Sequence, residues 1–160
     1  MRRLSFLVRE GRGGEAGAAL VEFALVLPIV LLLLLGMLDF GKAFNYWIDQ
    51  THLANEGARW AVVNKNPGPG GTLQDSMRQK ANTTELLSGG TASVPNPLQV
   101  CVTFPDGSSN VGDPVKVTVS VDYNWIPFIG NGIGLTTTTL SASSTMRLEA
   151  VPTNYGAGCA

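Results

Sequence analysis

Apolar residues dominate the N-terminal part of the chain, and one stretch of them is uninterrupted. Residues 23–38 read FALVLPIVLLLLLGML and include no charged side chain. Residues 16–21 (AGAALV) extend this stretch towards the N-terminus, with Glu22 as the interruption. As a helix, residues 16–38 would measure about 34 Å at about 1.5 Å per residue. Because a bilayer core requires about 20 apolar residues, the pattern predicts one transmembrane helix.

The basic residues around this span are distributed unevenly. Lys42 is the only basic residue in the first stretch after the span, whereas four arginines precede it: Arg2, Arg3, Arg9 and Arg12. Since basic side chains are retained on the cytoplasmic side, we predict a cytoplasmic N-terminus and an extracytoplasmic C-terminal part. An ordinary cleaved secretory signal is less favoured, because no Ala-x-Ala-like site follows the apolar run.

Helical periodicity continues after the span. Alternating steps of four and three connect a mostly apolar seam: Phe40, Phe44, Trp47, Thr51, Ala54, Ala58 and Ala61. The pattern predicts one helix over residues 18–63, whose seam packs on the chain's own sheet or on another subunit. Both can hold, with the lower part of the seam used for assembly and the upper part for the fold. Polar faces are assigned to Asp39, Lys42, Asp49, Gln50, Glu56 and Arg59. Residues 64–71 (NKNPGPGG) stop the helix.

The remainder of the chain predicts a small α+β domain. Residues 73–87 favour a short helix within a linker that spans residues 64–97. The region 98–160 holds three strand candidates, at residues 98–104, 115–123 and 135–148, with a loop at 126–134. We therefore predict an antiparallel sheet of about three strands, with one face covered by the upper part of the long helix.

The two cysteines, Cys101 and Cys159, lie in the predicted extracytoplasmic region. In an oxidising compartment they could form one disulfide that ties the C-terminal tail to the sheet, and two unpaired thiols are the alternative. By the chain-entropy model, a loop of this size stabilises the fold by about 4 kcal/mol.

Composition argues against catalysis and nucleic-acid binding. Only 14% of the residues are charged, the net charge is −1, and the basic residues do not form the cluster that phosphate binding requires. The single histidine, His52, lies near Asp49 and Glu56 at helical spacing, which we interpret as a solvated helix face. One histidine and two cysteines match no zinc site. We therefore expect no enzyme activity, catalytic residue, cofactor or metal.

Glu22 requires an explanation, since it lies inside an apolar helix. A cut after Gly17 would remove the basic leader, residues 1–17, and make Glu22 the fifth residue, followed by the aromatic Phe23. It would also free an ammonium group on Ala18, and the Ala18 ammonium of a neighbouring subunit could pair with a buried carboxylate. Alternatively, Glu22 lies close enough to the membrane interface to stay hydrated. The spacing resembles the processing site of type IV prepilins.

Residues 14–63 also resemble the TadE-like family of tight-adherence pilus proteins. The matching pieces are residues 19–28 (ALVEFALVLP), 36–41 (GMLDFG) and 54–61 (ANEGARWA). The resemblance implies a minor pseudopilin that is similar to type IV pilins in its N-terminal half and is cut by an aspartic prepilin peptidase after Gly17. It also implies that Glu22 is the carboxylate of the motif. Most members have glutamate at the position of Asp39, so the charge is kept.

The leading hypothesis is a minor pilin or pseudopilin of a tight-adherence (type IVc-like) pilus or secretion system. Its expected partners are other pilin subunits, the prepilin peptidase, the inner-membrane assembly platform and membrane lipid. It would reside in the inner membrane as a single-pass protein, with the pilus or cell surface as a further destination. The alternative is an uncleaved, membrane-anchored binding module. A secreted domain with a removed signal is a third, less favoured interpretation.

Overall fold

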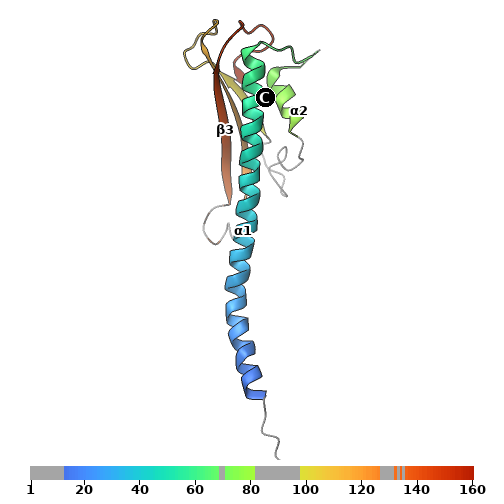
Figure 1. Cartoon of the computed structure of the whole chain (residues 1–160), viewed down its shortest axis with the longest axis vertical. Coiled ribbons are helices and arrows are strands. Elements are labelled where there is room, and N and C mark those ends of the chain that lie inside the picture. The colour runs from blue at the N-terminus through green and yellow to red at the C-terminus, as the bar shows by residue number, and fades with distance from the viewer. Residues whose placement is uncertain (1–12, 69–70, 82–97, 127–131, 133, 135) are drawn as a thin grey trace, which may run out of the picture. The chain divides into compact units, whose positions relative to one another are not determined.

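The computed structural model describes residues 13–68, 71–81, 98–126, 132, 134 and 136–160. Their elements follow the order α1, α2, β1, β2, β3 and β4 (Figure 1). Two units are distinguished, one ending at Leu38 and one formed by Asp39–Ala160, and each is described by itself. A long apolar helix followed by a small antiparallel sheet confirms the predicted α+β class.

Helix α1 comprises Gly13–Val62 and continues through Pro28. The predicted helix ended at Val63, one residue after the observed end. The observed helix begins five residues before Ala18, where the predicted helix began. The helix stops in a left-handed turn at Asn64, which has φ 48°. There the amide of Asn64 donates to the Ala61 carbonyl and the amide of Lys65 donates to the Trp60 carbonyl. This Schellman arrangement satisfies carbonyls that the helix end leaves without partners.

The Asn64 side chain also attaches the helix end to the C-terminal tail. Its Oδ1 accepts hydrogen bonds from the amides of Thr153 and Asn154, each at 3.0 Å. Its Nδ2 donates to Thr153 Oγ1 at 2.7 Å, and Asn154 Nδ2 donates to the Asn64 carbonyl at 2.8 Å. The stop signal in the sequence therefore also serves as a tertiary contact.

The predicted seam packs on the chain's own sheet only in its upper half. In the unit that begins at Asp39, the buried side of α1 comprises Asp39, Ala43, Tyr46, Gln50, Leu53, Ala54, Gly57, Ala58, Ala61 and Val62. Ala54, Ala58 and Ala61 are buried as predicted, but Phe40, Phe44 and Trp47 remain exposed. The buried face of the helix lies beside the predicted one, because Asp39 and Gln50, which were assigned to polar faces, are buried in the fold.

Helix α2 comprises Leu73–Lys80, so it is shorter than the predicted helix over residues 73–87. Its first turn carries a capping box, in which the Thr72 hydroxyl accepts from the Asp75 amide and the Asp75 carboxylate accepts from Thr72. The Thr72 hydroxyl, and after it the Thr72 amide, lower the pKa of Asp75 below its ordinary value. The backbone of Ala81 is already extended, and residues 82–87 lie outside the described residues.

The described residues form a four-stranded antiparallel sheet in the order β3-β2-β1-β4. Strand β1 is Gln99–Thr103, β2 is Pro114–Asn124, β3 is Thr137–Arg147 and β4 is Gly158–Cys159. The first three correspond to the predicted strands, and a short fourth strand, β4, joins them at the edge next to β1. Strand β4 was missed because two residues carry no periodicity that a sequence can show.

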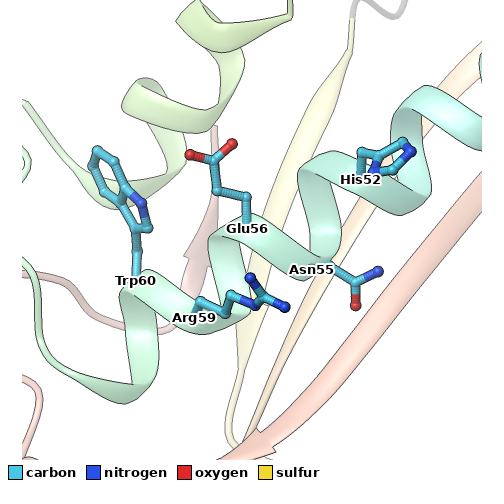
Figure 2. A pocket seen from close by; sticks show the side chains of 5 residues that line it. All are labelled: His52, Asn55, Glu56, Arg59 and Trp60. Carbon is cyan, nitrogen blue, oxygen red and sulfur yellow. The ribbon is translucent and has the colours of Figure 1, made fainter.

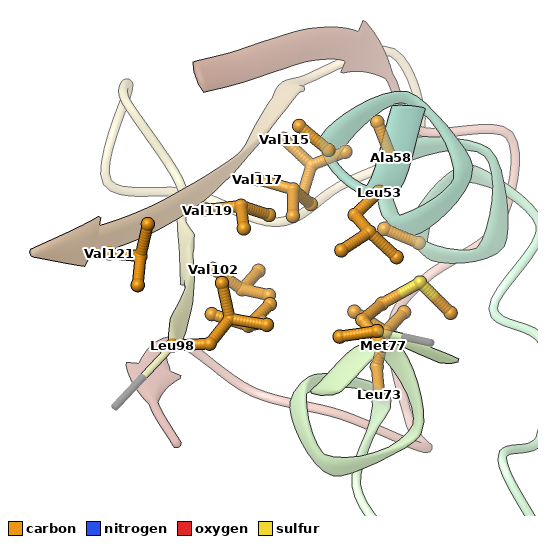
Figure 3. Packing of buried hydrophobic residues seen from close by; sticks show 14 of the residues in the cluster. Leu53, Ala58, Leu73, Met77, Leu98, Val102, Val115, Val117, Val119 and Val121 are labelled. Carbon is orange, nitrogen blue, oxygen red and sulfur yellow. The ribbon is translucent and has the colours of Figure 1, made fainter. Parts of the chain in front are cut away.

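The fold buries one face of the sheet under α1 and α2. Along β2 the residues alternate between buried and half-buried, as the predicted alternation of valines requires. Figure 3 shows that side chains from both helices and from the sheet meet in one core. They are Leu53 and Ala58 from α1, Leu73 and Met77 from α2, and Val102, Val115, Val117 and Val119 from the strands. This core fixes the upper part of α1 in the compact unit.

Cys101 and Cys159 lie opposite each other in the pairing of β1 with β4, and the structure joins them by a disulfide. The amide of Val100 donates to the Ala160 carbonyl at 2.9 Å, and the Ala160 amide donates to the Val100 carbonyl at 3.1 Å. The disulfide and this short ladder hold the C-terminal residues to the sheet.

Tyr155 packs the same tail against the end of α1. Its hydroxyl donates to the Ala61 carbonyl at 2.8 Å, and its ring stacks on Phe104. Burial raises the pKa of Tyr155 from 10.0 to about 12, because the phenolate would lose its hydration.

We therefore expect Tyr155 to ionise near pH 12 in the folded protein. A difference titration of tyrosinate absorbance, wild type minus Tyr155→Phe, isolates this group from the other tyrosines. Because the folded state holds the proton more tightly, its contribution to stability is full below about pH 10 and is lost as the pH rises towards about 12. A midpoint near pH 10 in the folded protein would contradict the expected burial of the hydroxyl.

Candidate assembly interface

The part of α1 before Asp39 presents an apolar surface that the chain itself leaves uncovered. Its large apolar side chains are between 37% and 71% exposed. Within the described residues, one helix is long and apolar enough to cross a membrane, and none of its most apolar window is buried. Such a continuous apolar surface is unstable in water and indicates contact with lipid or with other helices.

The predicted processing and assembly residues lie close together on this helix. Gly17, Ala18, Glu22 and Phe23 are all in α1 and exposed. A side chain added at Gly17 would meet no atom within 4 Å. Glu22 is the only ionisable residue between Gly17 and Leu38, and no ion pair to it exists within the described part of the chain. A carboxylate in this setting needs water or a cation from outside the chain.

Asp39, which the sequence pattern assigned to a polar face of the helix, is a further functional candidate. It is 4% exposed. Its Oδ1 accepts a hydrogen bond from the Tyr123 hydroxyl, which also donates to the Asp39 carbonyl at 3.1 Å. Its Oδ2 accepts from the Ile126 amide at 2.9 Å. Asp39 therefore fastens α1 to the end of β2. The only signal in the sequence was the acidic residue that the family resemblance expects here.

Replacing Asp39 with alanine should lower the free energy of unfolding by about 2 kcal/mol, because the buried Tyr123 hydroxyl and Ile126 amide lose their acceptor. Denaturant unfolding of the full chain in detergent measures this change. Tyr123→Phe removes one of the two donors and should cost less. Additive effects of Asp39→Ala and Tyr123→Phe in the double variant would contradict a direct interaction.

An exposed aromatic face lies beside the buried face of α1. Phe40 is 66% exposed, Phe44 52%, Trp47 46% and Ile48 36%. The Phe44 and Trp47 rings contact each other, with centroids 5.8 Å apart. These four residues are called here the aromatic face. Each keeps at least about a third of its surface exposed in the described part of the chain, so the lower part of the predicted seam remains available for an external partner.

A polar pocket opens on the upper part of α1. Its lining residues are His52, Asn55, Glu56, Arg59 and Trp60, around about 660 Å³ (Figure 2). Glu56 forms an ion pair with Lys80 of α2 and not with His52, its neighbour in the predicted cluster. In the described residues no group of three potential metal ligands exists. His52 itself is exposed, and the cluster has the character of a solvated helix surface.

Two lysines close over the indole of Trp60 beside this pocket. Lys65 Nζ lies 3.6 Å and Lys80 Nζ 4.3 Å from the centroid of the ring. These cation–π contacts and the Glu56–Lys80 pair connect the end of α1 with α2. Their role in the fold is structural, since they connect elements of the same compact unit.

Comparison with known proteins identifies part of α1. Residues 17–59 match the family model described as TadE-like protein. This segment is TadE-like. The match confirms the resemblance predicted from the sequence and associates the protein with tight-adherence pili, of which the family is a structural component. No curated protein and no solved structure matches the chain. The TadE-like segment includes Gly17, Glu22, Asp39 and the aromatic face, and it ends before α2 and the sheet.

Proposed function

We propose that this protein is a minor pilin or pseudopilin subunit of a tight-adherence pilus or secretion system, cut after Gly17 and assembled through α1. The observation that carries the proposal is the uncovered apolar part of α1 over residues 17–38, in which Glu22 is the single carboxylate. The TadE-like match over the same residues supports it. Partners would be other pilin subunits, a prepilin peptidase and an inner-membrane assembly platform.

The charges at the start of the processed helix give the assembly a physical basis. Cleavage after Gly17 leaves an ammonium group on Ala18, four residues before Glu22. When apolar helices pack side by side, a buried carboxylate is costly unless a cation approaches it. The Ala18 ammonium of one subunit and Glu22 of the next would satisfy each other and fix the axial register of the two helices.

The alternative function is an uncleaved single-pass anchor for an extracytoplasmic binding module. Asp39–Ala160 forms a compact unit, as such a module would. In that case lipid alone would cover the helix and Glu22 would stay at the hydrated membrane interface. Cleavage after Gly17 distinguishes the two functions, because an anchor has no need of it.

We expect the mature protein, purified from its native membrane, to begin at Ala18 when its N-terminus is determined by mass spectrometry. Gly17→Leu should abolish this cleavage without disturbing the fold, since a side chain at this position meets no atom within 4 Å. Gly14→Leu is the matched control, a glycine three positions earlier, and should be processed normally. An intact leader in wild-type cells that contain active peptidase would reject the pilin function and leave the anchored module.

A second variant separates processing from assembly. Glu22→Gln keeps the size of the side chain but removes the charge that the Ala18 ammonium would pair with. It should be cut at the wild-type rate and yet be depleted from sheared filaments or from subunit complexes isolated by crosslinking. Undiminished assembly of Glu22→Gln would contradict the proposed ion pair.

A further inference from the structure

The compact unit buries Asp39 and partly covers Lys42, the two charged residues that follow the apolar run in the sequence. Asp39 is buried beneath its hydrogen bonds with Tyr123 and Ile126. Lys42 is half-buried, and its ammonium lies 5.9 Å from the centre of the Tyr46 ring. The exposed surface of this part of the helix is therefore more apolar than its amino-acid sequence suggests.

Exposed residues of α1 remain almost entirely apolar from Leu38 to Ile48. Between residues 37 and 48, Asn45 is the only polar residue that is exposed; the other exposed residues are Met37, Leu38, Phe40, Gly41, Phe44, Trp47 and Ile48. On this side the apolar character of the helix thus continues ten residues beyond the run that hydropathy recognises.

Counting from Glu22 places the aromatic face relative to a bilayer. If hydrated Glu22 marks the inner boundary, the roughly 20 residues that cross the hydrocarbon core begin at Phe23 and end near Lys42. Phe40 then lies at the top of the core. The stretch from Lys42 to Trp47 covers about the next 7.5 Å of helix, which places Trp47 at the outer edge of an interfacial layer that is about 5–7.5 Å thick.

We propose that the aromatic face of α1 contacts lipid and seats the base of the folded domain in the outer interfacial layer of the membrane. Trp47 falls at the depth where tryptophan is enriched in membrane proteins, and the more apolar Phe40 lies deeper. Burial of Asp39 allows α1 to lie this deep in the membrane, because a carboxylate exposed to lipid there would raise the free energy of insertion. The inference rests on the membrane anchoring in the proposed function and is independent of cleavage after Gly17.

Depth-dependent quenching of tryptophan fluorescence tests this placement. The full-length, unprocessed chain is reconstituted at low protein density into phosphatidylcholine vesicles that carry bromine at a shallow or a deep position of the acyl chains. In the variant with Trp60→Phe and Trp125→Phe, Trp47 is the only tryptophan. We expect at least twofold stronger quenching by the shallow bromines than by the deep ones.

The matched control keeps Trp60 as the only tryptophan, through Trp47→Phe and Trp125→Phe, so both proteins share the loss of Trp125. Trp60 is capped by Lys65 and Lys80 and should be quenched at most half as strongly as Trp47. Equal quenching of the two would overturn the placement. Shielding of Trp47 together with efficient disulfide crosslinking of Phe44→Cys between copies would overturn it too, since a second helix would then occupy the face. Neither result bears on the start of the mature chain, which tests the proposed function separately.

Discussion

Replacing Gly57 with leucine is expected to destabilise the compact domain by about 3 kcal/mol or more. Gly57 lies where α1 packs against both β2 and α2. A Cβ atom built at this position would lie 3.0 Å from Val117 Cγ1 and 3.2 Å from Met77 Cγ. Even the first carbon requires the neighbouring side chains to shift by a few tenths of an ångström, and leucine adds three more, so the three elements would have to move apart.

Gly57→Ala should have a much smaller effect, because the gain of about 1 kcal/mol in helix propensity offsets part of the clash. Gly41→Ala is the matched control on the same helix, where a Cβ meets no atom within 4 Å, and should leave stability unchanged or raise it slightly. Denaturant unfolding of the full chain in detergent gives these values. A Gly57→Leu variant as stable as the wild type would contradict the close packing of the three elements.

Loss of the Cys101–Cys159 disulfide is expected to cost about 4 kcal/mol. The bond closes a loop with a sequence separation of 58 residues, and its removal restores that loop's entropy to the unfolded chain. Two residues of β4 form too short a ladder to stay paired by themselves. Without the bond, residues 158–160 should detach from β1, while the β2–β3 pairing remains intact.

The double variant Cys101→Ser and Cys159→Ser, compared with the wild type with and without reductant, measures this contribution. The reduced wild type and the double variant should unfold at the same denaturant concentration, well below the oxidised protein. Alkylation followed by mass spectrometry should find two reactive thiols only after reduction. Unchanged stability after reduction would mean that the β1–β4 contact holds the tail without the covalent bond.

The helix and strands are local properties of the sequence and could be read from it. The valines of β2 at every second position specify a half-buried strand, and the glycines and prolines after Asn64 exclude a helix. The TadE-like motif was likewise visible, since its residues follow one another within α1. Strand β4 could not be seen, because it exists only through its pairing with β1.

By itself, the sequence determined that a long apolar helix precedes a small antiparallel sheet and that Glu22 is the one carboxylate between Gly17 and Leu38. Only the tertiary structure decided which side of α1 faces the sheet. Two candidate stripes lie next to each other on the helix, and hydropathy favoured Phe40, Phe44 and Trp47. The sheet instead covers the stripe with Asp39 and Gln50, because partners distant in the sequence, Tyr123 and Ile126, satisfy the Asp39 carboxylate and remove the cost of burying it.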